Sequence, residues 1–189
     1  MPRCIPWIRR LAAALLFSLV AGAHADTWSF PPELATRSFE HGDVRVVLTT
    51  DARRNQQVPD FLLEIYSNGV RVAQIPGVSF EHLFASSDNY LFVGLSNRGL
   101  PGTAAVVFNA QGRLALLANH GMAEFDYCSR SVTLQRVWFD ENNPNVSFRL
   151  GEQEKEPGIF LRSCSGKSIE LLRTVQEAFA RAARVSQAK

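Results

Sequence analysis

The feature that most constrains the fold is a series of short segments in which apolar and polar residues alternate, separated by turn residues. Residues 44–48 alternate in this way and residues 61–65 repeat the pattern, which is typical of strands with one buried face. Asn68-Gly69 then precedes another apolar run. Asn-Gly between two such runs predicts a tight β-hairpin, because both residues tolerate a positive φ angle. Further strands are expected at residues 70–75, 78–85, 90–96, 103–108, 113–117, 132–139, 146–150 and 159–164.

Three of the predicted hairpins resemble one another, with turn glycines at 69, 112 and 166. The first interval, 43 residues, matches the repeat length of a propeller blade, and residues 82–117 give the best blade-like stretch. Three imperfect units are too few for an ordinary closed propeller. The sequence therefore predicts a mainly β fold with antiparallel sheets in an incomplete propeller-like or sandwich-like arrangement. The alternative is a coincidence among the hairpins of a meandering β-domain.

The period of the apolar residues changes near the C-terminus. Between residues 168 and 186 they recur every three or four positions, at Ile169, Leu172, Val175, Phe179 and Ala182. This spacing predicts one buried face of a terminal helix over 168–186. Ser168 is the expected N-cap, with Glu170 near the positive end of the helix dipole. We expect the helix to pack across the sheets.

The first 25 residues have the pattern of an export signal. Arginines at positions 3, 9 and 10 precede an uncharged apolar run over residues 11–21, and Ala23-His24-Ala25 follows as a small-x-small cleavage site. The apolar run is too short to span a bilayer as a stable helix. We therefore expect cleavage after Ala25, a periplasmic or secreted location, and no stable membrane insertion afterwards. The remaining residues, 26–189, are predicted to form a single β-rich domain.

Removal of this signal changes the charge and the cysteine count. It takes away three of the 20 Lys and Arg residues and none of the 18 Asp and Glu, so the formal net charge falls from +2 to −1. A near-neutral chain without a clustered basic surface gives no support for a nucleic-acid partner. Cys4 lies inside the signal, which leaves Cys128 and Cys164. An even pair in an oxidising compartment predicts a disulfide, the alternative being two buried thiols that pack as small apolar side chains.

No catalytic motif stands out. Residues 94–99 read Gly-Leu-Ser-Asn-Arg-Gly, but a nucleophile elbow needs the second glycine one place earlier and a helix after the serine. The histidines of the mature chain, at 41, 82 and 120, are scattered without metal-ligand spacing. Paired carboxylates for glycoside hydrolysis could come from distant positions such as Asp126 and Asp140, at a separation that sequence does not show. The sequence predicts no catalytic residue, no metal site and no cofactor, and favours a non-enzymatic protein while leaving an enzyme open.

The candidate functional segment is the loop from Ser96 to Gly102, which joins two strongly hydrophobic strands. It holds four residues that we predict to contact a partner: Ser96, Asn97, Arg98 and Leu100. Arginine at the edge of a loop restrained by a proline suits bidentate recognition of a carboxylate or of backbone carbonyls. The alternative interpretation is an ordinary solvent-exposed connection.

Taken together, the layout resembles that of one known family. The chain has an export signal, incomplete blades, a strand-loop-strand with serine at the start of the loop, and Cys-Ser-Gly-Lys-Ser at 164–168 before a terminal helix. These features resemble the periplasmic immunity proteins that neutralise peptidoglycan amidase effectors delivered by type VI secretion. The resemblance covers roughly Phe61 to the C-terminus and lies in layout more than in residue identities.

The resemblance implies a non-enzymatic protein whose partner is a toxin or effector. Members of that family insert a loop into the Cys-His active site of the effector, with a serine hydroxyl near the catalytic pair, and Ser96 is the corresponding position here. The loop of this chain departs from the pattern because it is longer and contains Leu100-Pro101. We therefore expect a periplasmic protein-binding module. A secreted hydrolase acting on cell-wall or glycan substrates, and an envelope scaffold protein, are the alternatives.

Overall fold

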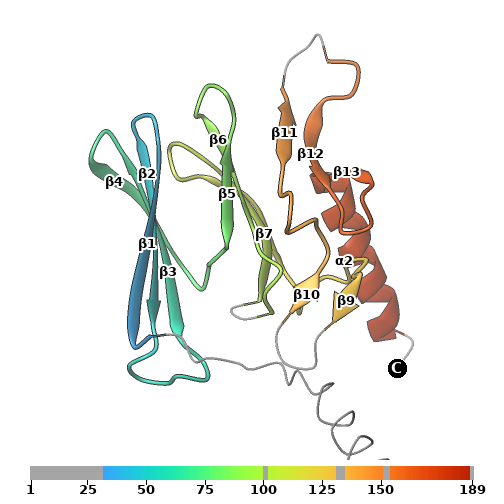
Figure 1. The fold of residues 1–189 in the computed structure, drawn as a ribbon, viewed down its shortest axis with the longest axis horizontal. Coiled ribbons are helices and arrows are strands. Elements are labelled where there is room, and N and C mark those ends of the chain that lie inside the picture. Colours follow the sequence, from blue (N-terminus) through green and yellow to red (C-terminus); the bar gives the residue numbers. More distant parts are fainter. Residues whose placement is uncertain (1–31, 100–101, 131–134, 151–153, 188–189) are drawn as a thin grey trace, which may run out of the picture.

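Three layers stand side by side in the protein (Figure 1). The computed structural model describes residues 32–99, 102–130, 135–150 and 154–187. The first layer is an antiparallel sheet in the order β1-β2-β3-β4. Its strands are β1 (Leu34–His41), β2 (Val44–Asp51), β3 (Asp60–Ser67) and β4 (Val70–Pro76).

The middle layer is a second four-stranded antiparallel sheet in the order β5-β6-β7-β8. It consists of β5 (His82–Ala85), β6 (Leu91–Leu95), β7 (Thr103–Asn109) and β8 (Leu114–Asn119). In both sheets, strands that are consecutive in sequence are neighbours in space, which is how the strands of a propeller blade are connected.

The third layer is C-terminal and is built differently. A two-stranded ladder pairs β9 (Ser129–Arg130) with β10 (Arg136–Val137), and a three-stranded sheet contains β11 (Val146–Arg149), β12 (Gly158–Arg162) and β13 (Ser168–Glu170). Helix α2 (Leu171–Gln187) follows directly and contacts β12 and β13. Its buried residues are Leu171, Val175 and Ala178. Of the face predicted from the apolar periodicity, Val175 is buried, but Leu172 is 41 % exposed, so the buried face is rotated from the predicted one.

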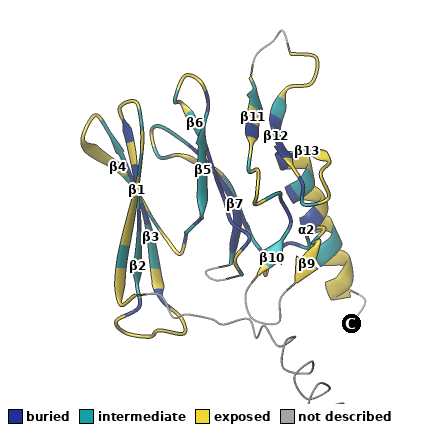
Figure 2. Cartoon of the chain, viewed as in Figure 1, coloured by how far each residue is buried: buried dark blue, intermediate teal, exposed yellow. Residues whose placement is uncertain are grey.

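The middle sheet is covered on both faces, and this explains its composition. Val106 and Phe108 of β7 belong to the hydrophobic cluster shared with the first sheet, whereas Ala105 and Val107 belong to the cluster shared with the C-terminal layer. Alternate residues of a strand point to opposite faces, so a strand with two buried faces must be apolar throughout. Figure 2 shows the contrast, since the strands of the first sheet carry many exposed residues and β7 is mostly buried.

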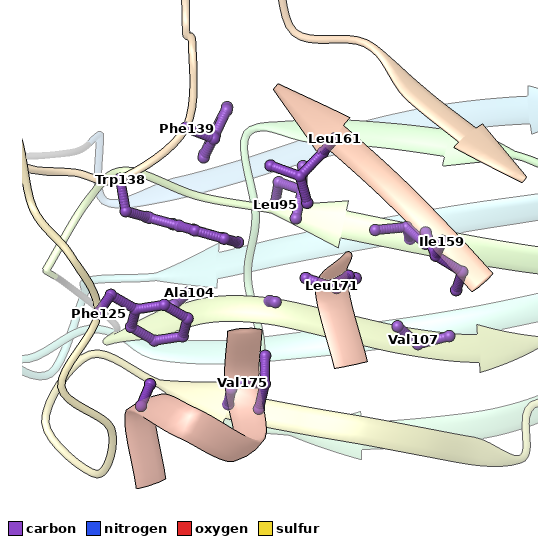
Figure 3. Packing of buried hydrophobic residues seen from close by; sticks show 14 of the residues in the cluster. Leu95, Ala104, Val107, Phe125, Trp138, Phe139, Ile159, Leu161, Leu171 and Val175 are labelled. Carbon is purple, nitrogen blue, oxygen red and sulfur yellow. The ribbon is translucent and has the colours of Figure 1, made fainter. Parts of the chain in front are cut away.

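Aromatic rings pack in the cluster that the middle sheet shares with the C-terminal layer. Figure 3 shows Phe125 and Trp138 among the aliphatic residues of the middle sheet, β12 and α2. The two ring centroids are 4.7 Å apart, and Trp138 is 2 % exposed. The face toward the first sheet is also closely packed: a Cβ atom placed on Gly94 of β6 would lie 2.4 Å from the ring of Phe80, which belongs to the segment between β4 and β5.

Most elements follow the sequence-based expectations. The mainly β fold, the incomplete propeller-like or sandwich-like arrangement of antiparallel sheets and the C-terminal helix are confirmed. The turn at Asn68-Gly69 has φ angles of 50° and 77°, as the hairpin motif requires. The blade-like stretch at residues 82–117 corresponds to β5–β8. Among the described residues, no helix is long and apolar enough to cross a membrane.

The predicted start of the helix is wrong. Ser168 is not the N-cap, because Ser168–Glu170 pairs with β12 as β13. The carboxylate of Glu170 accepts hydrogen bonds from the backbone N–H groups of Leu172 and Arg173 at 3.2 and 2.7 Å. Glu170 therefore caps α2 and places its negative charge at the positive end of the helix dipole.

Strand β1 is absent from the sequence-based expectations. Its side that faces the middle sheet carries one large apolar residue, Phe39, together with Arg37 and His41. The Arg37 guanidinium donates hydrogen bonds to the backbone carbonyls of Phe80 and Glu81. Because β1 contacts the middle sheet through Arg37 as well as Phe39, its sequence lacks the regular alternation of apolar and polar residues that predicts a strand.

Candidate functional site

The first two residues of the predicted loop are buried. Ser96 and Asn97 directly follow β6 and are 2 % and 1 % exposed. In this conformation their side chains face the protein interior and not the surface, where contact with a partner was expected. Leu100 lies outside the described residues.

The Asn97 side chain connects the middle sheet to the C-terminal layer. Its carboxamide oxygen accepts a hydrogen bond from the backbone N–H of Trp138 at 3.1 Å, and its NH₂ group donates to the carbonyl of Phe139 at 3.3 Å. The side chain therefore hydrogen bonds to the backbone of two consecutive residues, Trp138 and Phe139. Because these groups are buried, each depends on this partner for its hydrogen bond.

The backbone of the loop continues the same pairing. The Asn97 carbonyl accepts a hydrogen bond from the N–H of Arg136 at 2.7 Å, and Arg98 forms an isolated antiparallel bridge with Gln135. On the other side, the Ser96 N–H donates to the carbonyl of Ala104 at 3.0 Å. The loop is thus held from both sides at its base. We call the paired segments 96–98 and 135–139 the loop clamp.

The predicted disulfide is confirmed, and it adjoins the loop clamp. Cys128 and Cys164 are bonded across a sequence separation of 36 residues. The N–H of Cys128 donates to the carbonyl of Val137, and the N–H of Cys164 donates to the carbonyl of Trp138. Both cysteines therefore contact the strand that receives Asn97, so the covalent bond restrains this strand in the folded protein.

The Ser96 carbonyl accepts two buried hydrogen bonds. Its donors are Nε2 of His120 at 3.1 Å and Nε1 of Trp138 at 3.0 Å. Since a carbonyl cannot donate, we assign the proton of His120 to Nε2, and Nδ1 then accepts from the Tyr127 hydroxyl at 3.1 Å. A turn lies at residues 120–121, and the imidazole ring of His120 supports the loop from inside the protein.

Burial keeps this network neutral at physiological pH. It lowers the pKa of His120 to about 4, with the Arg136 charge acting in the same direction and the hydrogen bond to Ser96 opposing it. Burial also raises the pKa of Tyr127, so the hydroxyl retains its proton and can donate to His120. The loop is therefore supported by uncharged groups whose hydrogen-bonding roles are fixed.

Arg98 is the predicted contact residue that the structure places at the surface. Its side chain is 68 % exposed, and its Nε lies 2.5 Å from Oε1 of Glu81. The other oxygen of that carboxylate accepts a hydrogen bond from the Asn97 N–H at 3.3 Å, and the Ser96 hydroxyl accepts one from the Arg98 N–H at 2.9 Å. Glu81 and Ser96 thereby orient the arginine at the point where the chain leaves the clamp.

The two acids considered for glycoside hydrolysis have separate arginine partners. Asp126 pairs with Arg181 of α2, and Asp140 pairs with Arg162 of β12. Over residues 32–99, 102–130, 135–150 and 154–187, no group of three or more His, Cys, Asp or Glu side chains is arranged to hold a metal ion.

Sequence reasoning missed the residues that support the loop from elsewhere in the chain. Glu81, His120 and Trp138 lie 16 to 42 residues from their partners in the loop. Glu81 and Trp138 lie within predicted strands, 78–85 and 132–139, but an alternating pattern does not show that a strand residue contacts the loop. Comparisons with models of protein families, with curated proteins and with solved structures found no match for this chain.

Proposed function

We propose that the chain is an exported, non-enzymatic protein-binding module that presents the loop beginning at Arg98 to a partner. The observation that carries the proposal is the contrast within the loop. Ser96 and Asn97 are buried in the loop clamp, while the neighbouring Arg98 side chain is 68 % exposed. Residues 96–98 are held by internal hydrogen bonds, so this base of the loop loses little conformational entropy on binding, which favours affinity.

The exposed arginine indicates the chemistry of the contact. A guanidinium offers several donors in a planar fork that matches a carboxylate or two backbone carbonyls. Glu81 engages Nε, so the terminal nitrogens can turn toward a partner. The Glu81 side chain is 16 % exposed and the Arg98 side chain 68 %, so Glu81 can keep its contact with Nε while the terminal nitrogens bind an acceptor on the partner.

The resemblance to immunity proteins suggests a peptidoglycan amidase effector as the partner. In this chain the contact would differ from the family pattern in one respect. The Ser96 hydroxyl accepts a hydrogen bond from the Arg98 N–H inside the protein, so we assign Ser96 to holding the loop and Arg98 to meeting the partner. The same proposal includes export of the chain, with cleavage after Ala25. Export would deliver the chain to an oxidising compartment, in which a disulfide persists.

The proposal is tested by capture from an envelope fraction, using the purified chain from residue 26 as bait. The substitution Arg98→Glu reverses the charge at the loop and should abolish capture of the partner without lowering the melting temperature. Arg113→Glu is the matched control, because Arg113 is exposed in the β7–β8 turn, at the opposite end of the middle sheet.

The two variants separate the possible results. Loss of the captured protein with Arg98→Glu alone supports the loop as the contact. Equal capture by the wild type and both variants removes the loop from consideration.

The identity of the partner and export have their own tests. If the partner is a peptidoglycan amidase effector, the captured protein should have amidase activity that the wild-type chain inhibits. Intact mass of the protein recovered from the envelope should correspond to a chain that starts at Asp26, and an uncleaved chain would contradict export by this signal.

A further inference from the structure

A polar hollow of about 320 Å³ lies on the outer face of the β11–β12–β13 sheet, away from the loop clamp. The opposite face of this sheet is the one that packs inward, through Val146, Ile159 and Leu161. The hollow is lined by Asn143, Asn145, Ser147, Phe160, Leu161, Arg162, Gly166 and Ser168. Its concave surface therefore combines amides, hydroxyls, a guanidinium and one aromatic ring.

The strand register explains why these side chains meet. Phe160 pairs with Ser147 of β11, and Arg162 pairs with Ser168 of β13. Residues two apart on a strand share a face, so Phe160 and Arg162 project to the same side with their cross-strand partners. Asn145 precedes β11 and shares the face of Ser147 by the same rule.

The charges at the hollow are balanced. Arg162 Nε lies 3.4 Å from Oδ2 of Asp140, and the other oxygen of Asp140 accepts hydrogen bonds from the N–H groups of Asn142 and Asn143. Arg149 stacks on the Phe160 ring, 4.1 Å from its centroid, and pairs with Glu156 at 3.8 Å. Among the described lining residues the charged side chain, Arg162, thus has a carboxylate partner, and the hollow offers donors and acceptors side by side.

Among the described residues, the side chains of Asn145, Ser147 and Ser168 have no hydrogen-bond partner within the protein. All three are exposed. An amide supplies donors and an acceptor together, and a hydroxyl supplies both as well. Their donors and acceptors are therefore free to bind a ligand that also donates and accepts.

We propose that this hollow is a binding site for a neutral saccharide. Adjacent sugar hydroxyls donate and accept hydrogen bonds in pairs, which the amides, hydroxyls and Arg162–Asp140 pair complement. The apolar C–H face of a sugar ring would rest on Phe160, the one aromatic residue among the described residues that line the hollow. The balanced charge favours an uncharged ligand over an anion. This site is separate from the loop clamp and does not depend on the proposed protein partner.

The test is a titration of the isotopically labelled chain with tri-N-acetylchitotriose and with maltotriose, followed by amide chemical shifts in NMR. At least one trisaccharide should give saturable shifts centred on residues 143–147 and 160–168. Asn145→Ala should weaken binding by about tenfold, the equivalent of one lost hydrogen bond of 1.4 kcal/mol, and Phe160→Ala should weaken it further.

Tyr66→Ala is the matched control, since Tyr66 carries a stacked arginine, Arg45, on the exposed face of the first sheet. This variant should bind as the wild type does. Because Asn145 is exposed, its substitution leaves the fold intact and keeps the test valid if Phe160→Ala is unstable. Absence of saturable shifts with both trisaccharides up to about 20 mM, or equal affinity of Asn145→Ala and the wild type, would overturn the proposal.

Discussion

The substitution Asn97→Ala tests the loop clamp by removing one buried side chain. It leaves the N–H of Trp138 and the carbonyl of Phe139 without the hydrogen bonds that they make at 3.1 and 3.3 Å. Trp138 and Phe139 are 2 % and 1 % exposed, so water cannot replace the amide without a local opening. Each buried backbone group left unpaired costs about 1–3 kcal/mol, so the two groups predict a loss of about 2–6 kcal/mol in the free energy of unfolding.

Urea denaturation at pH 7, monitored by far-UV circular dichroism, measures this loss. Asn142→Ala is the matched control, because the Asn142 side chain is exposed and only its backbone N–H is hydrogen bonded. The control should change the free energy of unfolding by no more than about 0.5 kcal/mol. A loss below about 1 kcal/mol for Asn97→Ala, with an unchanged m-value, would refute the assignment of Asn97 as a structural connection between the layers.

Three further predictions concern the same core. Because the pKa of His120 falls from 6.5 to about 4 on folding, the unfolded state binds the proton first, so stability should fall by about 3 kcal/mol between pH 7 and pH 4; an equal pH dependence in His120→Asn would contradict this. Replacing Cys128 and Cys164 by alanine should cost about 4 kcal/mol in chemical denaturation, from the entropy of the closed loop, and a cost below about 1 kcal/mol would be inconsistent with it. Gly94→Ala should destabilise by about 1–3 kcal/mol because its methyl group would overlap an aromatic ring, whereas Gly121→Ala, which meets open space, should be nearly neutral in the same melting experiment.

The elements that local sequence could predict are those whose signal is contained within a few residues. The Asn68-Gly69 hairpin depends on two residues that accept positive φ, and the helix depends on apolar residues spaced by three or four. The predicted start of the helix lies three residues too early, because pairing of Ser168–Glu170 with β12 overrides the local helical pattern. Long-range pairing of this kind is not encoded in the periodicity of one segment.

The loop clamp shows the same limit at the candidate site. The sequence identified the loop and its exposed Arg98, but it gave no indication that Asn97 would be buried against residues 138–139, 41 and 42 positions away. Asparagine is common in exposed turns, so its local context favours the surface. Only the docking of the C-terminal layer on the middle sheet gives its amide two backbone partners and assigns it a structural role.

Native-state hydrogen exchange at the backbone N–H of Trp138 tests the rigid base of the loop most directly. This N–H donates to the Asn97 side chain at 3.1 Å and lies in the core shared by the middle sheet and α2. If the clamp holds the loop as described, this amide should exchange only through an opening that approaches global unfolding, as is also expected for the amides of the buried strand β7. Exchange of the Trp138 amide at the rate of an exposed turn such as Asn142, while β7 remains protected, would contradict the account.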